Sequence, residues 1–101
     1  MAIGDYLAQL QSFWEFELYV VGETPKAKLA YDNLKRLCDE YLPDRCKITI
    51  QDIAKNPKLA RGNEIKAIPT IIRKAPLPRK TLVGDLTNSE RAVSRLELKI
   101  P

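Results

Sequence analysis

The chain has 101 residues, an apolar fraction of 45% and a net charge of +4, from 17 basic and 13 acidic residues. That length and composition fit one domain with a modest core, and no apolar run approaches the roughly 20 residues that span a bilayer. The mild positive charge permits an acidic partner. The basic residues of the second half lack aromatic neighbours on which bases could stack, so neither nucleic acid nor a membrane is expected as partner.

The sequence contains no histidine. This excludes catalysis by Cys–His pairs or Ser–His–Asp triads and removes most zinc sites. The four glycines are too scattered to form a phosphate-binding loop. We therefore expect no catalytic residue, no metal and no cofactor.

Residues 1–12 are predicted to be an N-terminal extension, and residues 13–101 a single domain. The extension has neither the basic start nor the apolar centre of a secretory signal, so a cytoplasmic location is expected.

The first half of the domain predicts a βαβ unit. Apolar and polar side chains alternate over 14–21, as in a strand with one buried face. Thr24 and Pro25 then begin a helix, because threonine caps free N–H groups and proline suits the first turn. Pro43 ends the helix, and 46–53 forms a second strand. Strands joined in this way are parallel, with a right-handed crossover.

The second half predicts shorter elements. Asn56-Pro57 repeats the cap-and-proline pattern before a short helix over 58–65. Short strands are expected after Ile68-Pro69-Thr70 and at Leu82-Val83, with turn structure at Pro76-Leu77-Pro78 between them.

A final helix is expected from residue 88 to about 98. Thr87 and Glu90 stand at the spacing of a capping box, in which each side chain bonds the backbone N–H of the other residue. Val93, Leu96 and Ile100 would form its buried side.

This order of elements resembles the thioredoxin fold, in which the proline before the third strand is cis. Ile68-Pro69 would be that bond, with cis and trans both open from the sequence. Thioredoxin chemistry needs two thiols at the start of the first helix, where this chain has Gly22-Glu23-Thr24-Pro25. Cys38 and Cys46 are instead expected to be buried small hydrophobic residues.

Five blocks of sequence resemble signatures of the KaiB family, and they follow in the family's order with the family's spacing between them. Leu18–Pro25 resembles LYVAGNTP, and Asp52–Ala60 resembles DVLKNPQLA. The other three match the family's TPT, PLP and IGDL elements: Ile68-Pro69-Thr70, Pro76-Leu77-Pro78 and Val83-Gly84-Asp85-Leu86.

The resemblance implies an α/β fold with a thioredoxin-like βαβ core, a mixed four-stranded sheet and three helices. The alternative is the family's ground-state arrangement of the C-terminal half, since KaiB proteins switch folds. It further implies a non-enzymatic circadian clock protein that binds the KaiC ATPase ring and modulates its phosphorylation. KaiA or a clock histidine kinase is a further possible partner, and a homo-oligomer, dimer or tetramer, is expected.

The predicted site residues form two groups. The expected partner-binding residues are Lys28, Lys74, Arg79 and Lys80. The expected fold-switch or structural residues are Pro69, Gly84, Asp85, Thr87, Glu90 and Arg95, the last of which stands where the family often has glycine. Two other readings stay open: a redox-inactive or glutathione-handling thioredoxin-fold protein, and the KaiB-like sensor domain of a clock kinase.

Overall fold

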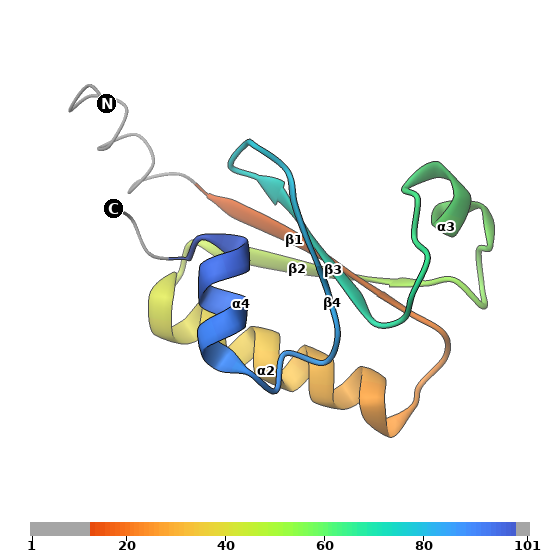
Figure 1. The fold of residues 1–101 in the computed structure, drawn as a ribbon, viewed down its shortest axis with the longest axis horizontal. Helices are drawn as coiled ribbons and strands as arrows, with labels where there is room; N and C mark the ends of the chain where they lie inside the picture. Colours follow the sequence, from red (N-terminus) through yellow and green to blue (C-terminus); the bar gives the residue numbers. More distant parts are fainter. Residues whose placement is uncertain (1–12, 99–101) are drawn as a thin grey trace.

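The computed structural model describes residues 13–98. Within them a mixed sheet of strand order β2-β1-β3-β4 carries α2 and α4 on one face (Figure 1). β2 is parallel to β1, β3 is antiparallel to β1, and β4 is antiparallel to β3. The elements are β1 (Trp14–Val20), α2 (Pro25–Tyr41), β2 (Cys46–Asp52), α3 (Lys58–Gly62), β3 (Thr70–Ala75), β4 (Lys80–Val83) and α4 (Ser89–Leu96).

The βαβ unit confirms the expectation from the sequence. The hydroxyl of Thr24 accepts a hydrogen bond from the backbone N–H of Ala27 at 3.0 Å, and Pro25 occupies the first turn of α2. The parallel register runs from Trp14 opposite Cys46 to Val20 opposite Asp52. The cap and the alternating strand are local signals, which explains why the sequence alone predicts them.

The core lies between the sheet and its two helices. β1 contributes alternate side chains from Trp14 onward, and α2 and α4 cover them with their apolar faces. The buried residues of the helices are Ala30, Leu34, Leu37, Cys38, Ala92 and Leu96. Val93 is half-buried, and Ile100 lies outside the described residues.

Cys46 differs from expectation. Cys38 is buried on α2, as predicted, but Cys46 is only half-buried. The reason is the strand order: β2 is an edge strand of the sheet, so the end of α2 covers the start of that strand incompletely.

α3 is shorter than predicted. It ends at Gly62, and its N-terminus has no side-chain cap, so the expected cap from Asn56 is wrong. Glu64 adopts a positive φ of 56°, and the N–H of Ile65 bonds back to the carbonyl of Ala60 at 2.8 Å. A left-handed residue closes a helix in this way, so the helix cannot run on to residue 65.

The predicted capping box of α4 is also wrong. The cap is Asn88, whose side-chain oxygen accepts from the N–H of Arg91 at 3.0 Å. Thr87 turns the other way and donates its hydroxyl to Asp85 at 2.6 Å. Thr87 and Asn88 are both good caps, and the bond to Asp85 engages the threonine.

We expect Asn88→Ala to lower the free energy of unfolding by about 1 kcal/mol, because the backbone N–H of Arg91 in the first turn of α4 loses its acceptor. Glu90→Ala, at the other position of the predicted box, should change it by less than about 0.5 kcal/mol. Urea unfolding of both variants measures the difference. Equal losses would restore Glu90 to a capping role.

The bond before β3, Ile68–Pro69, is cis, as in the thioredoxin fold. Ala75–Pro76 and Leu77–Pro78 in the β3–β4 turn are cis as well, which the sequence did not indicate. Within residues 13–98, no helix is long and apolar enough to cross a membrane.

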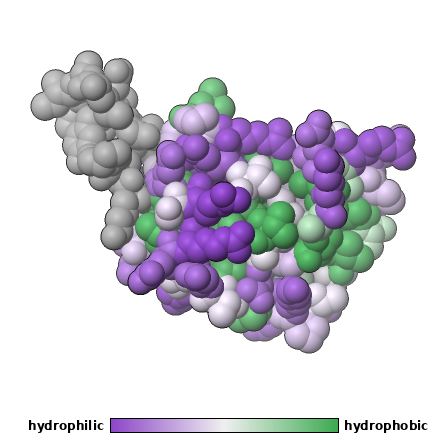
Figure 2. Space-filling view, in the orientation of Figure 1, coloured by the Kyte–Doolittle hydropathy of each residue, from purple (hydrophilic) through white to green (hydrophobic). Residues whose placement is uncertain are grey.

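Apolar patches interrupt the hydrophilic exterior of the molecule (Figure 2). The large apolar side chains that stay exposed are Phe13, Val21, Leu29, Ile50, Ile68, Leu77 and Val83. They are spread over strand edges, turns and α2.

Candidate functional site

The start of α2 is where a thioredoxin carries its thiols, and in this chain it is held by a carboxylate. Asp52, at the end of β2, accepts hydrogen bonds from the backbone N–H groups of Gly22 and Ala54, each at 2.9 Å. The bond from Gly22, together with the other backbone donors, holds the pKa of Asp52 below its usual value. Gly22 has a φ of 68°, which glycine adopts without strain. The loop is therefore fixed in position but offers no sulfur for exchange.

A groove of about 760 Å³ lies beside this loop, between the start of α2 and the β2 edge. Lys28 lines it, together with apolar side chains of β1 and β2 such as Val20 and Ile50. The ammonium of Lys28 lies 3.3 Å from the carboxylate of Asp32, on the next turn of α2.

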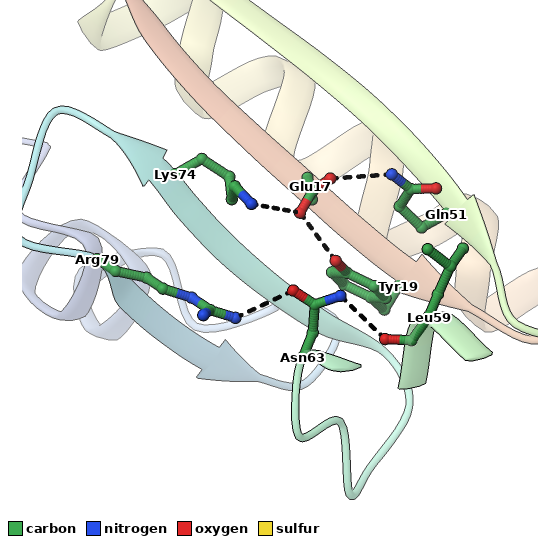
Figure 3. A network of polar contacts seen from close by, with 7 residues as sticks. All are labelled: Glu17, Tyr19, Gln51, Leu59, Asn63, Lys74 and Arg79. Carbon is green, nitrogen blue, oxygen red and sulfur yellow. Dashed lines mark hydrogen bonds and ion pairs between the residues drawn. The ribbon is translucent and has the colours of Figure 1, made fainter. Parts of the chain in front are cut away.

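The sheet face opposite α2 and α4 carries a polar network centred on Glu17 (Figure 3). Its carboxylate accepts from the Tyr19 hydroxyl at 2.8 Å and from the side-chain amide of Gln51 at 2.9 Å. The ammonium of Lys74 lies 3.6 Å from the same carboxylate. Side chains from β1, β2 and β3 therefore meet at one acidic group.

This network changes the acidity of its members. Burial disfavours the charged form of Glu17, but the hydrogen bonds from Gln51 and Tyr19 and the charge of Lys74 outweigh it and lower the pKa of the carboxyl. Burial and the neighbouring Glu17 carboxylate raise the pKa of Tyr19. At neutral pH the centre is thus a carboxylate that accepts from a neutral phenol.

Arg79 extends the same face toward α3. Its guanidinium donates to the side-chain oxygen of Asn63 at 3.4 Å, and the Asn63 amide donates to the carbonyl of Leu59 at 2.9 Å (Figure 3). Arg79 also acts on Tyr19 through its charge, which lowers the pKa of that phenol against the larger opposing effects. Arg79 and Lys74 therefore belong to one surface, which we call the polar face: Glu17, Tyr19, Gln51, Asn63, Lys74 and Arg79.

The four predicted partner-binding residues do not form one cluster. Lys74 and Arg79 share the polar face. Lys80 pairs in register with the core-facing Arg73, so it lies on the helix side of the sheet, where it contacts Glu97 at 3.1 Å. Lys28 lies on α2. The alternation of β1 could have indicated Glu17 and Tyr19, but their contact with Gln51 depends on the parallel register.

One of the predicted fold-switch residues, Asp85, joins the two halves of the chain, and three others make hydrogen bonds within the second half. The N–H of Gly84 donates to the carbonyl of Pro69 at 2.9 Å, and Gly84 has a φ of 125°. The side chain of Asn33 on α2 donates to the carbonyl of Asp85 at 2.8 Å. The Asp85 carboxylate accepts hydrogen bonds from the backbone N–H and the hydroxyl of Thr87. Both bonds lower the pKa of Asp85, and the bond from the hydroxyl has the larger effect.

Glu90 and Arg95 are exposed on α4. One contact between α2 and α4 is not indicated by the sequence: the Arg36 guanidinium donates to the Ser89 hydroxyl at 3.0 Å.

Arg73 is a further residue that sequence reasoning missed. Its side chain is fully buried and donates to the carbonyls of Leu96 and Pro78, each at 2.7 Å. Its guanidinium carbon lies 5.1 Å from the centre of the Trp14 ring, which suits a cation–π contact. Burial lowers the pKa of this guanidinium, which nevertheless stays protonated. Arg73 therefore connects β3, the β3–β4 turn and the end of α4.

We expect Glu17→Gln to lower stability by about 1 kcal/mol near neutral pH, because the charged acceptor of the network is lost. The pKa of Glu17 is lower in the folded state, so its contribution is fully present above the unfolded pKa of about 4.3 and is lost as pH falls through the folded value. The difference between the two proteins should therefore shrink as pH falls and vanish once the folded carboxyl is itself protonated.

Urea unfolding as a function of pH measures this difference. Glu15→Gln, an exposed change on the same face of β1, is the control and should show a change of less than about 0.5 kcal/mol. A difference for Glu17→Gln that persists at low pH would contradict an ionic role.

The fold is shared with solved structures of low sequence identity. The N-terminal domain of Synechococcus elongatus SasA matches with a TM-score of 0.70 at 17% identity, over 89% of each chain. Mitochondrial thioredoxin 3 from Saccharomyces cerevisiae matches with a TM-score of 0.63 at 16% identity, over 91% of this chain and 87% of that one. With no thiol at the start of α2, the chain is a thioredoxin-fold protein that lacks the thioredoxin redox site.

Sequence comparison specifies the family. The family model of the KaiB domain matches residues 17–98. The circadian clock oscillator protein KaiB of Thermostichus vulcanus is 32% identical over 92 residues, which cover 91% of this chain and 85% of the relative. KaiB of Synechococcus elongatus is 34% identical over 82 residues, or 81% of this chain and 80% of the relative. The chain belongs to the KaiB family of circadian clock proteins.

Proposed function

We propose that this protein binds a KaiC-type ATPase ring and modulates the ring's phosphorylation and ATP hydrolysis without catalysing a reaction itself. The observation that carries the proposal is the arrangement of β3, β4 and α4 on the βαβ unit. It is thioredoxin-like, and the KaiB resemblance associates this arrangement with KaiC binding. KaiA or a clock histidine kinase is a further candidate partner.

The polar face is the part of the predicted interface that suits an acidic partner best. The Lys74 side chain is 45% exposed, and Arg79 is exposed beside it. Exposed charges at the rim of an interface steer the encounter and set its salt dependence. Lys28 and Lys80, on other sides of the fold, would contribute only if the partner extends around the edge strands.

The second proposed property is exchange with the family's ground-state arrangement, in a dimer or tetramer. The described contacts from α2 to the second half are few: Asn33 to Asp85 and Arg36 to Ser89 outside the apolar core. Two packings of one chain can exchange when their free energies differ by only a few kcal/mol. The predicted extension over 1–12, which could take part in an oligomer, lies outside the described residues.

We expect Arg95→Gly to shift this equilibrium away from the thioredoxin-like arrangement by about two- to fivefold. Arg95 lies in the last turn of α4, and a helix-interior glycine costs about 0.5–1 kcal/mol. The variant should bind KaiC more slowly. Arg95→Ala removes the charge but keeps the helix propensity, so its populations should match the parent protein. NMR peak intensities report both, and equal populations for Arg95→Gly would show that Arg95 does not control the exchange.

The proposed function is tested by size-exclusion chromatography with the KaiC protein of the same genome, in the presence of ATP or ADP. Co-elution under at least one nucleotide condition is expected, with a change in the rate of ATP hydrolysis. Absence of a complex under every condition would refute the proposal. Turnover of insulin or a glutathione substrate would instead favour the thioredoxin-fold enzyme.

A further inference from the structure

Two cysteines lie against each other at the end of α2. The sulfur of Cys38, near the C-terminal end of α2, is 2.8 Å from the sulfur of Cys46, the first residue of β2. Both are free thiols. A disulfide bond is about 2.05 Å long, so bond formation needs less than about 1 Å of sulfur movement. The two residues belong to rigid elements joined by a short turn, which holds them together.

The pair is open to reagents on one side. A pocket of about 220 Å³ lies at the same place and is lined by both cysteines. Cys46 is half-buried and Cys38 is buried, so a reagent in the pocket meets Cys46 first. The other lining residues are Tyr31, Lys35, Asp39, Leu42, Asp44 and Ile48.

We propose that Cys38 and Cys46 are a reversible dithiol–disulfide site that reacts with small disulfides such as oxidised glutathione. The Cys46 thiolate attacks one sulfur of the small disulfide, and a mixed disulfide forms as one thiolate leaves. Cys38 gives up its proton and attacks the Cys46 sulfur, and the second small thiolate leaves. The protein loses two hydrogen atoms and two electrons, and the small disulfide is reduced to two thiols.

The surroundings favour this order of attack. A hydrogen bond from Cys38 stabilises the Cys46 thiolate, and the nearby Lys35 ammonium adds to this effect, so the pKa of Cys46 is lowered. The same contact and burial raise the pKa of Cys38. The negative charge of Asp39 disfavours the Cys46 thiolate, but the Asp39 carboxylate forms an ion pair with the Lys35 ammonium at 2.6 Å. The outer thiol is therefore the nucleophile and the inner one resolves the mixed disulfide.

This site is distinct from the thioredoxin position, which lies at the other end of α2 and has no sulfur. It also differs from the KaiC-binding proposal, because both cysteines belong to the βαβ half of the chain. Intracellular disulfides are usually transient and redox-sensing. A bond that joins α2 to β2 would stiffen the edge of the sheet.

The test uses the full chain, reduced and then freed of reductant. After incubation with oxidised glutathione, acid quenching and alkylation, intact mass spectrometry should show a monomer that has lost two hydrogen atoms and carries no glutathione. Reduced glutathione in excess should reverse the reaction. The melting temperature should rise on oxidation by on the order of 10 °C, because a closed loop constrains the unfolded chain.

Two variants separate the roles of the sulfurs. Cys38→Ser should retain a stable glutathione adduct on Cys46, whereas Cys46→Ser should react at least about tenfold more slowly. A wild-type product that keeps glutathione, links two chains or retains both free thiols would overturn the proposal, whether or not the variants fold. Equal reaction rates of the two variants would overturn the assigned order of attack.

Discussion

Arg73→Ala is expected to lower the free energy of unfolding by about 3 kcal/mol, a large share of the 5–15 kcal/mol that holds a typical domain. The arginine makes two short hydrogen bonds, to Leu96 and Pro78, and lies over the Trp14 ring. A hydrogen bond to a charged group contributes about 1.5–3 kcal/mol, and the lost side chain leaves a cavity. Relief from burying the charge offsets part of this loss.

The loss should be uneven along the chain. Arg73 and its two acceptors lie in the second half, so hydrogen exchange should accelerate in β3, β4 and α4 before it does in α2 and β2. Arg73→Lys is the matched control: it keeps the charge but cannot reach two carbonyls with a planar fork, so it should recover only part of the stability. Urea unfolding and amide exchange measure both effects. An Arg73→Ala variant as stable as the wild-type protein, or a loss of amide-exchange protection that is uniform along the chain, would contradict this role.

Arg73 also shows where sequence reasoning ends. A charged residue inside an apolar strand suggests an exposed position, because an arginine is rarely fully buried without partners. Its acceptors are two backbone carbonyls, one five residues and the other 23 residues further along the chain. No side-chain pattern indicates where a carbonyl will point. The position therefore becomes clear only when β3, the turn and the end of α4 are placed together.

The first half was predicted more completely because its signals are local. The alternation of β1, the Thr24 cap and the Pro25 start each act within a few residues, and the structure confirms them. In the second half two candidate caps, Thr87 and Asn88, stand side by side, and the choice depends on the bond from Thr87 to Asp85. The two caps have similar propensity, so one hydrogen bond between residues two apart in the chain is enough to decide between them.

The candidate site was predicted in part for the same reason. The sequence located basic residues near β3 and β4, but the face that each one occupies depends on the register across the β3–β4 turn. Arg73 pairs with Lys80 in that register, which separates Lys80 from Lys74. The thiol contact of Cys38 with Cys46 likewise depends on how α2 packs over the edge strand.

Removal of both exposed charges of the polar face, in Lys74→Gln/Arg79→Gln, is expected to weaken KaiC binding by about tenfold or more. The free-energy change corresponds to about 1.4 kcal/mol. Most of it should appear as slower association and a weaker salt dependence, since charges at an interface rim act mainly on encounter. Glutamine avoids the repulsion that a glutamate at 74 would create with Glu17, which lies 3.6 Å from the Lys74 ammonium. The fold should therefore be retained.

A matched control distinguishes docking from net charge. Lys26→Gln/Arg91→Gln also removes two exposed positive charges, from α2 and α4 on the opposite side of the sheet, and leaves Lys74 and Arg79 intact. Surface plasmon resonance at several salt concentrations compares both variants with the parent protein. An equal loss in the two variants would mean that overall charge governs the encounter. Unchanged kinetics in Lys74→Gln/Arg79→Gln would place the docking surface elsewhere, with Lys28 and Lys80 the next residues to replace. A loss confined to Lys74→Gln/Arg79→Gln would identify the polar face as the surface that meets the ring, because the two variants differ only in where the charge was removed.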